Sequence, residues 1–373
     1  MAGIYIHIPF CKQACSYCNF YFTTSPKLKG DFVEALLREI ELQKHFFSGE
    51  EIETIYFGGG TPTRLGANDL LRISESIFKN FSCNISEFTI EANPDDLTER
   101  KLKELSALRE FGFNRFSIGV QSFSEEDLRY MNRAHSAQEA LSSIKRTQDF
   151  GFELLTIDLI YGTPTLQDSQ WLKNLEIVKN LQVPHFSSYA LTVEDGTSLA
   201  QKIKKQKSLP IDEEKATAQF DILMNFAAEN NFEHYEISNY AKPGKKAVHN
   251  TNYWLGKSYL GLGPSAHSFK ELERSWNKPN LRAYISNLKN GLLSNESENL
   301  TPIQHANEYI MTSLRTALGL DLNNSLVQKF RISLVEKLQA VNAEFYSFDK
   351  EIITLTNKGK HFADAVALAL WLE

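Results

Sequence analysis

The chain has 373 residues, of which 42% are hydrophobic and 23% charged, an ordinary globular composition for one large barrel with an appendage or for two domains. The formal net charge of -6 argues against nucleic acid as a partner, because broad nucleic-acid binding needs a basic surface. No apolar run could span a bilayer and no leader precedes a long apolar stretch, so we expect a cytoplasmic protein without stable membrane insertion.

The first predicted strand, Gly3–Ile8, leads into a loop that is rich in cysteine. Cys11, Cys15 and Cys18 lie within eight residues in the pattern Cys-x3-Cys-x2-Cys, and we call Cys11–Cys18 the cysteine loop. Cysteines this close together usually share a metal rather than form disulfides. Three thiolates fit either a zinc ion completed by a distant histidine or a [4Fe-4S] cluster with one iron open to a small molecule.

From Gly3 to about Leu191, short β-branched or aromatic runs alternate with segments that carry apolar residues at helical spacing. The predicted strands are Gly3–Ile8, Ile52–Phe57, Glu87–Ala92, Arg115–Val120, Leu154–Ile160 and His185–Leu191. The predicted helices are Asp31–Phe46, Asp69–Phe81, Thr98–Phe111, Glu125–Met131, Ala137–Phe150 and Ser169–Leu181. Six β/α units in series predict a parallel sheet, either doubly wound or closed toward a barrel, with ligands at the carboxyl ends of the strands.

The distinctive polar residues and glycines of this half fall at those carboxyl ends. The cysteine loop follows the first strand, and the later strand ends carry Gly58–Gly60 and Thr61, Glu91, Gln121, Asp158, and finally Tyr189 and Ala190. Because the strand ends of a parallel sheet meet at one rim, these groups together describe a ligand site.

The cysteine spacing, with the aromatic Tyr17 before the last cysteine, resembles the signature of radical S-adenosylmethionine (SAM) proteins. The resemblance implies a partial (β/α)6 TIM-like barrel and a [4Fe-4S] cluster whose open iron is chelated by SAM. It also implies an electron donor such as flavodoxin or ferredoxin. Arg115–Phe123 extends the match to the coproporphyrinogen oxidase-like group, whose SAM contacts fall here at Tyr5, Tyr17, Gly60, Thr61, Glu91, Gln121, Arg133, Asp158 and Ala190.

The residue types at these positions suit the parts of SAM. The glycine run Gly58–Gly60 lets backbone groups approach a ligand closely, because no Cβ stands in the way. Glu91 and backbone carbonyls can accept from the ammonium group, and Arg133 can pair with the carboxylate. Gln121 and Asp158 can bind the ribose hydroxyls.

After Leu191 the pattern changes, and a long predicted helix, Asp212–Asn230, precedes an aromatic stretch. Two histidines, His249 and His267, occur there with Tyr253, Trp254 and Tyr259. They could form an aromatic-walled pocket for a planar tetrapyrrole with a histidine ligand, or a core cluster of hydrogen-bonded histidines. The motif His-Asn-x-x-Tyr-Trp resembles that of the heme-chaperone branch of the family, which implies heme binding by His249, Tyr253 and Trp254, with His249 as the ligand.

The last part of the chain is predicted to contain three helices, a hairpin at Phe345–Thr356 and a final helix over 357–372. This order resembles a small winged-helix module, for which a lid or packing role suits the acidic chain better than DNA binding. We therefore expect three regions: a radical SAM barrel at 1–200, a connector and heme region at 201–300, and a mainly helical, winged-helix-like module at 301–373.

Two functions fit the resemblance. One is a heme chaperone that binds heme or a porphyrin and delivers it to acceptor proteins. The other is oxygen-independent coproporphyrinogen III oxidase, a SAM-dependent oxidoreductase that decarboxylates two propionates in porphyrin biosynthesis. The oxidases carry a further cysteine where this chain has Phe20, and an extension ahead of the first strand, which here begins almost at Met1. Both departures, with the motif at His249, favour the chaperone.

Overall fold

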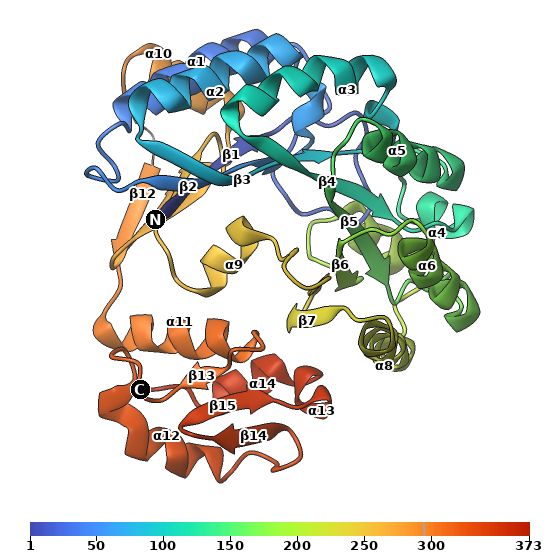
Figure 1. The fold of residues 1–373 in the computed structure, drawn as a ribbon, viewed down its shortest axis with the longest axis vertical. Helices are drawn as coiled ribbons and strands as arrows, with labels where there is room; N and C mark the ends of the chain where they lie inside the picture. The colour runs from blue at the N-terminus through green and yellow to red at the C-terminus, as the bar shows by residue number, and fades with distance from the viewer. Residues whose placement is uncertain (294) are drawn as a thin grey trace.

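The computed structural model describes residues 1–293 and 295–373. A 12-stranded sheet in the order β12-β11-β10-β9-β1-β2-β3-β4-β5-β6-β8-β7 organises most of the chain (Figure 1). Its central strands are β1 (Ala2–Ile8), β2 (Ile52–Gly59), β3 (Cys83–Ala92), β4 (Phe113–Gln121), β5 (Leu154–Tyr161) and β6 (His185–Ala190), each parallel to the next. The predicted strands and their parallel pairing are confirmed. Their sequential order is that of a partial barrel, because a doubly wound sheet reverses its order part-way.

The helices that connect these strands lie on the outer face of the sheet (Figure 1). They are α1 (Lys29–Leu42), α2 (Ala67–Asn80), α3 (Glu99–Leu105), α4 (Glu125–Tyr130), α5 (Ala137–Asp149) and α6 (Asp168–Asn180). The predicted helix Thr98–Phe111 is α-helical to Leu105 and then tightens into a 3-10 segment, Ser106–Phe111, that ends at Gly112 with a φ of 85°. A positive φ of this kind favours glycine, which explains the stop.

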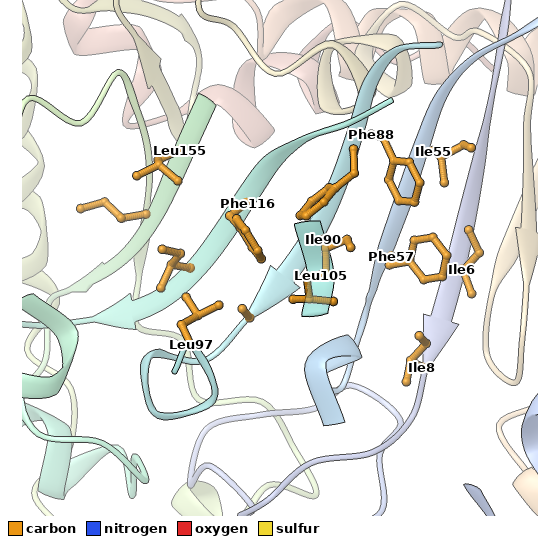
Figure 2. Packing of buried hydrophobic residues seen from close by; sticks show 14 of the residues in the cluster. Ile6, Ile8, Ile55, Phe57, Phe88, Ile90, Leu97, Leu105, Phe116 and Leu155 are labelled. Carbon is orange, nitrogen blue, oxygen red and sulfur yellow. The ribbon is translucent and has the colours of Figure 1, made fainter. Parts of the chain in front are cut away.

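The hydrophobic core fills the space between the sheet and the outer helices. Figure 2 shows alternate side chains of the central strands in this layer, among them Ile6 and Ile8 of β1, Phe57 of β2 and Phe116 of β4. Fully burying one such side chain contributes roughly 1.5–3 kcal/mol. Successive residues of a strand point to opposite faces, so Tyr5, between the buried Ile4 and Ile6, points into the barrel interior.

Residues 201–300 extend the same sheet at both edges. After α7 (Ser198–Lys204) and α8 (Glu213–Glu229), β8 (Asn239–Ala241) pairs antiparallel with β6, and β7 (Glu233–Glu236) pairs antiparallel with β8 at the edge of the sheet. At the other edge, β9 (Tyr259–Leu262) runs parallel to β1 and is followed by β10 (His267–Lys270), β11 (Glu273–Asn277), α10 (Leu281–Lys289) and β12 (Asn295–Asn299). This region therefore shares one sheet and one hydrophobic core with the barrel.

The C-terminal residues form a separate cluster with their own core, below the barrel in Figure 1. Its elements are α11 (Pro302–Leu314), β13 (Leu320–Asp321), α12 (Arg331–Leu338), β14 (Tyr346–Asp349), β15 (Ile352–Leu355), α13 (Asn357–Lys360) and α14 (Ala363–Ala369). The predicted hairpin is present, but two α-helices with a 3-10 turn replace the three expected before it. The predicted final helix is divided, because Phe362 leaves helical geometry and stacks its ring on Phe345 at 4.6 Å.

Helix α9 (Val248–Trp254) lies on the inner side of the sheet and is held there by a buried ion pair (Figure 1). Arg115 Nε lies 2.9 Å from Glu87 Oε2, and both side chains are 2% exposed. Glu87 also accepts hydrogen bonds from the backbone N–H groups of Val248 and His249, at the positive end of the helix. Arg115 is the third residue of β4, and Glu87 lies in the first half of β3, so α9 covers the barrel interior on its amino-terminal side. Among the described residues, no helix has the length and apolar character needed to cross a membrane.

Replacing Arg115 with Met is expected to lower the free energy of unfolding by about 3–5 kcal/mol, because it leaves the Glu87 carboxylate buried without its partner. Chemical denaturation measures the loss. The control is Arg100→Met, which removes a pair with Glu104 whose arginine is 87% exposed and should cost less than about 1 kcal/mol. Equal losses in the two variants would contradict a special role for the buried pair.

Candidate functional site

The cysteine loop is held against the segment that follows α4. The Asn132 side-chain amide donates to the Ala14 carbonyl at 2.6 Å, and the Gln13 amide donates back to the Asn132 carbonyl at 2.9 Å. The backbone N–H of Ser16 donates to the Met131 carbonyl at 2.9 Å. These bonds fix a segment without regular secondary structure.

Arg133 joins the cysteine loop to the barrel. Its Nη1 donates to Cys15 Sγ at 3.2 Å, and its Nη2 donates to Asn93 Oδ1 and to the Gly119 carbonyl, each at 2.6 Å. Asn93 follows β3 and Gly119 lies in β4, so the guanidinium bridges two strand ends and a sulfur. Donors of this kind orient metal ligands. The sequence predicts that Arg133 pairs with a SAM carboxylate. In the structure both terminal nitrogens of Arg133 already donate hydrogen bonds, one to the cysteine loop and one to the ends of the strands.

Cys11 sits against the glycine run after β2. Thr61 Oγ1 donates to Cys11 Sγ at 3.9 Å and accepts from Asn93 Nδ2 at 3.1 Å. A Cβ on Gly60 would lie 3.0 Å from the Cys11 sulfur, so a larger residue would crowd the thiol. Burial raises the pKa of Cys11 to about 11 and also raises the pKa of Cys18. The thiols of Cys11 and Cys18 therefore need a bound cation to become thiolate ligands at neutral pH.

The donor set of the loop fits an iron–sulfur cluster. All three cysteines are half-buried and free of disulfides. No three His, Cys, Asp or Glu side chains in ranges 1–293 and 295–373 are close enough to ligate one metal ion. In a [4Fe-4S] cluster each cysteine binds a different iron, so the three sulfurs do not have to converge on a single point.

Two carboxylates, Glu91 and Asp158, lie inside the barrel, and neither forms a salt bridge within residues 1–293 and 295–373. Glu91 accepts from the Tyr56 hydroxyl at 2.7 Å and from the Gly59 N–H at 3.2 Å, and burial raises its pKa to about 8. Asp158 lies 3.3 Å from the Ser117 hydroxyl, and burial raises its pKa to about 6. Groups desolvated in this way favour a ligand that brings positive charge or hydroxyl donors.

The other predicted SAM contacts lie around the same strand ends. Tyr5 stacks on Tyr56 at 6.0 Å between ring centroids, and Tyr17 interacts with the Arg133 guanidinium. Gln121 ends β4 with a φ of 67°, just after a shift in the β4–β5 register, so its side chain leaves the regular strand pattern. Ala190 is the exposed last residue of β6. Gly60, Thr61 and Arg133 contact the cysteines, while Glu91 and Asp158 lie deeper in the barrel.

A cavity of about 400 Å³ opens beside the cysteine loop at the β1–β9 edge. It is lined by Tyr5, His7, Asn19, Phe20, Tyr21, Tyr253, Tyr259, Ser265 and His267. Phe20, which replaces the extra cysteine of the oxidases, is 69% exposed at this cavity. His7 was not predicted, although it follows Tyr5 by two residues and therefore shares its face of the strand.

The three predicted heme-binding residues do not gather at one place. Tyr253 lines the cavity, but His249 lies behind it with Nδ1 2.8 Å from Thr54 Oγ1 and Nε2 3.0 Å from the Tyr253 hydroxyl. Burial lowers the pKa of His249 to about 3. His249 therefore matches the second of the two alternatives that the sequence left open, a hydrogen-bonded histidine in the core. Trp254 packs elsewhere, with the Arg315 guanidinium 5.6 Å from its ring centroid at the C-terminal module. Iron ligation by His249 would require one of its two hydrogen bonds to break.

Comparison with known proteins shows the family to which the chain belongs and the fold that it shares. Residues 5–178 match the Radical SAM superfamily model. The chain is 34% identical to heme chaperone HemW of Bacillus subtilis, covering 86% of this chain and 84% of the relative. It is 31% identical to heme chaperone HemW of Lactococcus lactis, covering 95% of this chain and 93% of the relative. The solved structure of coproporphyrinogen III oxidase (HemN) from Escherichia coli superposes with a TM-score of 0.84 at 23% identity, covering 99% of this chain and 90% of that chain.

The similarity to the oxidase structure shows a shared fold, because the sequence identity is low. The chain belongs to the radical SAM superfamily, the class that its partial barrel and cysteine loop define. Within that superfamily it belongs to the HemW family, since relatives at 30% identity or more match it over most of its length.

The raised pKa of Glu91 predicts a pH-dependent stability. Because the folded pKa of about 8 exceeds the ordinary value of 4.5, the contribution of Glu91 to stability is present at low pH and is lost as the pH rises through this window. Glu91→Gln should therefore gain stability relative to the parent between about pH 5 and about pH 8.5.

Denaturant unfolding of the cofactor-free protein at several pH values tests this expectation. The control is Glu110→Gln at an exposed position, which should show no such trend. An unchanged difference between Glu91→Gln and the parent across this pH range would contradict the raised pKa.

Proposed function

We propose that this protein is a heme chaperone that binds heme and delivers it to acceptor proteins. The observation that carries the proposal is the aromatic cavity beside the cysteine loop, in a chain related over 86% and 95% of its length to two HemW proteins. Those relatives are named heme chaperones, and the same activity is the simplest use of this cavity.

The cysteine loop would hold a [4Fe-4S] cluster through Cys11, Cys15 and Cys18, with SAM on the remaining iron. When bound, the cluster supplies one-electron chemistry, for which flavodoxin or ferredoxin is a suitable donor. Thr61 and Arg133 donate to two of the three sulfurs and would orient them. The protein thus supplies both the ligands and the groups that position them.

The barrel interior would hold SAM next to the cluster. Glu91 and Asp158 would accept from the ammonium group and the ribose hydroxyls, because both carboxyls are desolvated and neither has a salt-bridge partner in the described part of the chain. Tyr5, Tyr17, Gly60, Gln121 and Ala190 would complete the contacts as their places in the family imply.

Heme would occupy the cavity, where Tyr253 and Tyr259 present aromatic surface to a planar ligand. A volume of about 400 Å³ falls in the range of small-molecule and cofactor sites. The cavity shares Tyr5 with the proposed SAM site, so heme and SAM would be neighbours.

The alternative is the oxidase activity of HemN, with which this chain shares its fold. Phe20 argues against it, because the loop lacks the additional cysteine of the oxidases. The exposed Phe20 ring instead adds apolar surface to the cavity.

Anaerobic reconstitution of the parent protein should yield about four iron atoms per chain and the absorption of an iron–sulfur cluster. Cys15→Ala should lose this cluster, because only two of the three ligands remain. The matched control is Cys83→Ala, at the start of β3, which should reconstitute normally. Iron analysis with absorption spectroscopy decides the point, and a normal cluster in Cys15→Ala would refute the ligand set.

Heme titration and a turnover assay separate the two functions. The parent should develop a Soret band on adding heme and pass the heme to an apo-acceptor protein. With coproporphyrinogen III, SAM and a reductant, it should form no protoporphyrinogen, while Escherichia coli HemN serves as the positive control. Protoporphyrinogen formation would establish the oxidase instead, and SAM cleavage without it would leave the chaperone proposal standing.

A further inference from the structure

Two of the three histidines in or behind the cavity are committed to hydrogen bonds within the protein. His249 is bonded at both ring nitrogens, to Thr54 and Tyr253. His7 lies with Nδ1 3.2 Å from the Tyr5 hydroxyl and Nε2 2.9 Å from the Tyr21 carbonyl. Ligation of iron by either ring would cost an existing bond.

His267, the first residue of β10, differs from these two. Its side chain is exposed and lines the cavity directly. Within 1–293 and 295–373, no hydrogen bond occupies either of its ring nitrogens. Its ring stacks on Trp276 of β11, with centroids 6.1 Å apart and planes at 26°, which supports one face of the ring.

The turn that presents His267 is fixed by the buried carboxylate of Glu39. Glu39 accepts from the Gly263 N–H at 2.8 Å, from Asn277 Nδ2 at 2.6 Å and from the Tyr284 hydroxyl at 2.6 Å. Burying a carboxylate is costly unless it is hydrogen-bonded, so these three donors specify one arrangement of the turn.

The glycines of the same turn hold it close to its neighbours. A Cβ on Gly261 would lie 2.0 Å from the His267 carbonyl, and one on Gly263 would lie 2.4 Å from the His7 carbonyl. Gly263 also has a φ of 96°, which glycine adopts at little cost. A ring held on such a rigid turn at the cavity lining, whose nitrogens make no hydrogen bond among the described residues, is positioned for ligation.

We propose that His267 is the axial ligand of heme iron in this cavity, with Tyr253 and Tyr259 as aromatic walls. The inference rests on the proposed heme-binding function and assigns its ligand to the β9–β10 turn. His249 then serves to position Tyr253 through their hydrogen bond.

The test titrates hemin into the full-length parent protein, His267→Ala, His267→Met and His249→Gln, and follows the Soret region in ferric and dithionite-reduced samples. His267→Ala should shift the Soret maximum and weaken binding by at least about tenfold. His267→Met should retain heme with the altered spectrum of a thioether ligand, which a merely structural role would not produce. His249→Gln should keep the Soret maximum of the parent, because the ligand remains, while its affinity for hemin falls by less than that of His267→Ala because His249 only positions Tyr253.

The outcomes separate this inference from the function on which it rests. If the parent binds heme and His267→Ala keeps its spectrum and affinity, the ligand assignment is wrong while the chaperone proposal stands. If His249→Gln alone changes the ligation, His249 is the ligand. If the parent binds no heme, both proposals fail. Circular dichroism of each variant confirms folding before the titration.

Discussion

The site depends above all on the buried guanidinium of Arg133. The cysteine loop has no secondary structure to fix its thiols, and Arg133 ties Cys15 to the ends of β3 and β4 through Asn93 and the Gly119 carbonyl. Because Asn93 also donates to Thr61, which reaches Cys11, one polar network connects two of the three cysteines. The loop is thereby prepared for a cluster by groups that belong to the barrel.

The barrel is organised differently at its two ends. On the amino-terminal side, Glu87 of the Glu87–Arg115 ion pair accepts a hydrogen bond from the backbone of α9, and this helix, with His249, covers the barrel interior. At the carboxyl end, the cysteine loop and strand-end residues form the proposed cofactor site. The cavity lies along the β1–β9 edge, where strands from the two halves of the chain pair. A heme site built there would belong to both halves, because its walls come from β1, α9 and β9.

Most of the barrel could be predicted from the sequence because its signals are local. Short β-branched or aromatic runs located all six strands, and the cysteine spacing indicated the class of cofactor. The C-terminal module was less predictable, since the break between α13 and α14 coincides with a ring contact between Phe362 and Phe345, which lies outside the predicted final helix. The edge strands β9–β12 were not predicted, because short strands carry little periodic signal and their pairing partners lie far away in the chain.

The sequence by itself determined the six β/α units, the spacing of the three cysteines and the family, because each depends on local spacing and motif. Only the tertiary structure decided which side chains share a site. His249 forms a hydrogen bond with Thr54, which lies 195 residues away in the chain. Trp254 packs against Arg315, and His267 lines the cavity. The physical reason is that a hydrogen bond or a ring contact depends on where distant strands pair. A sequence motif identifies candidate residues, but the packing of the sheet determines which side chains each of them contacts.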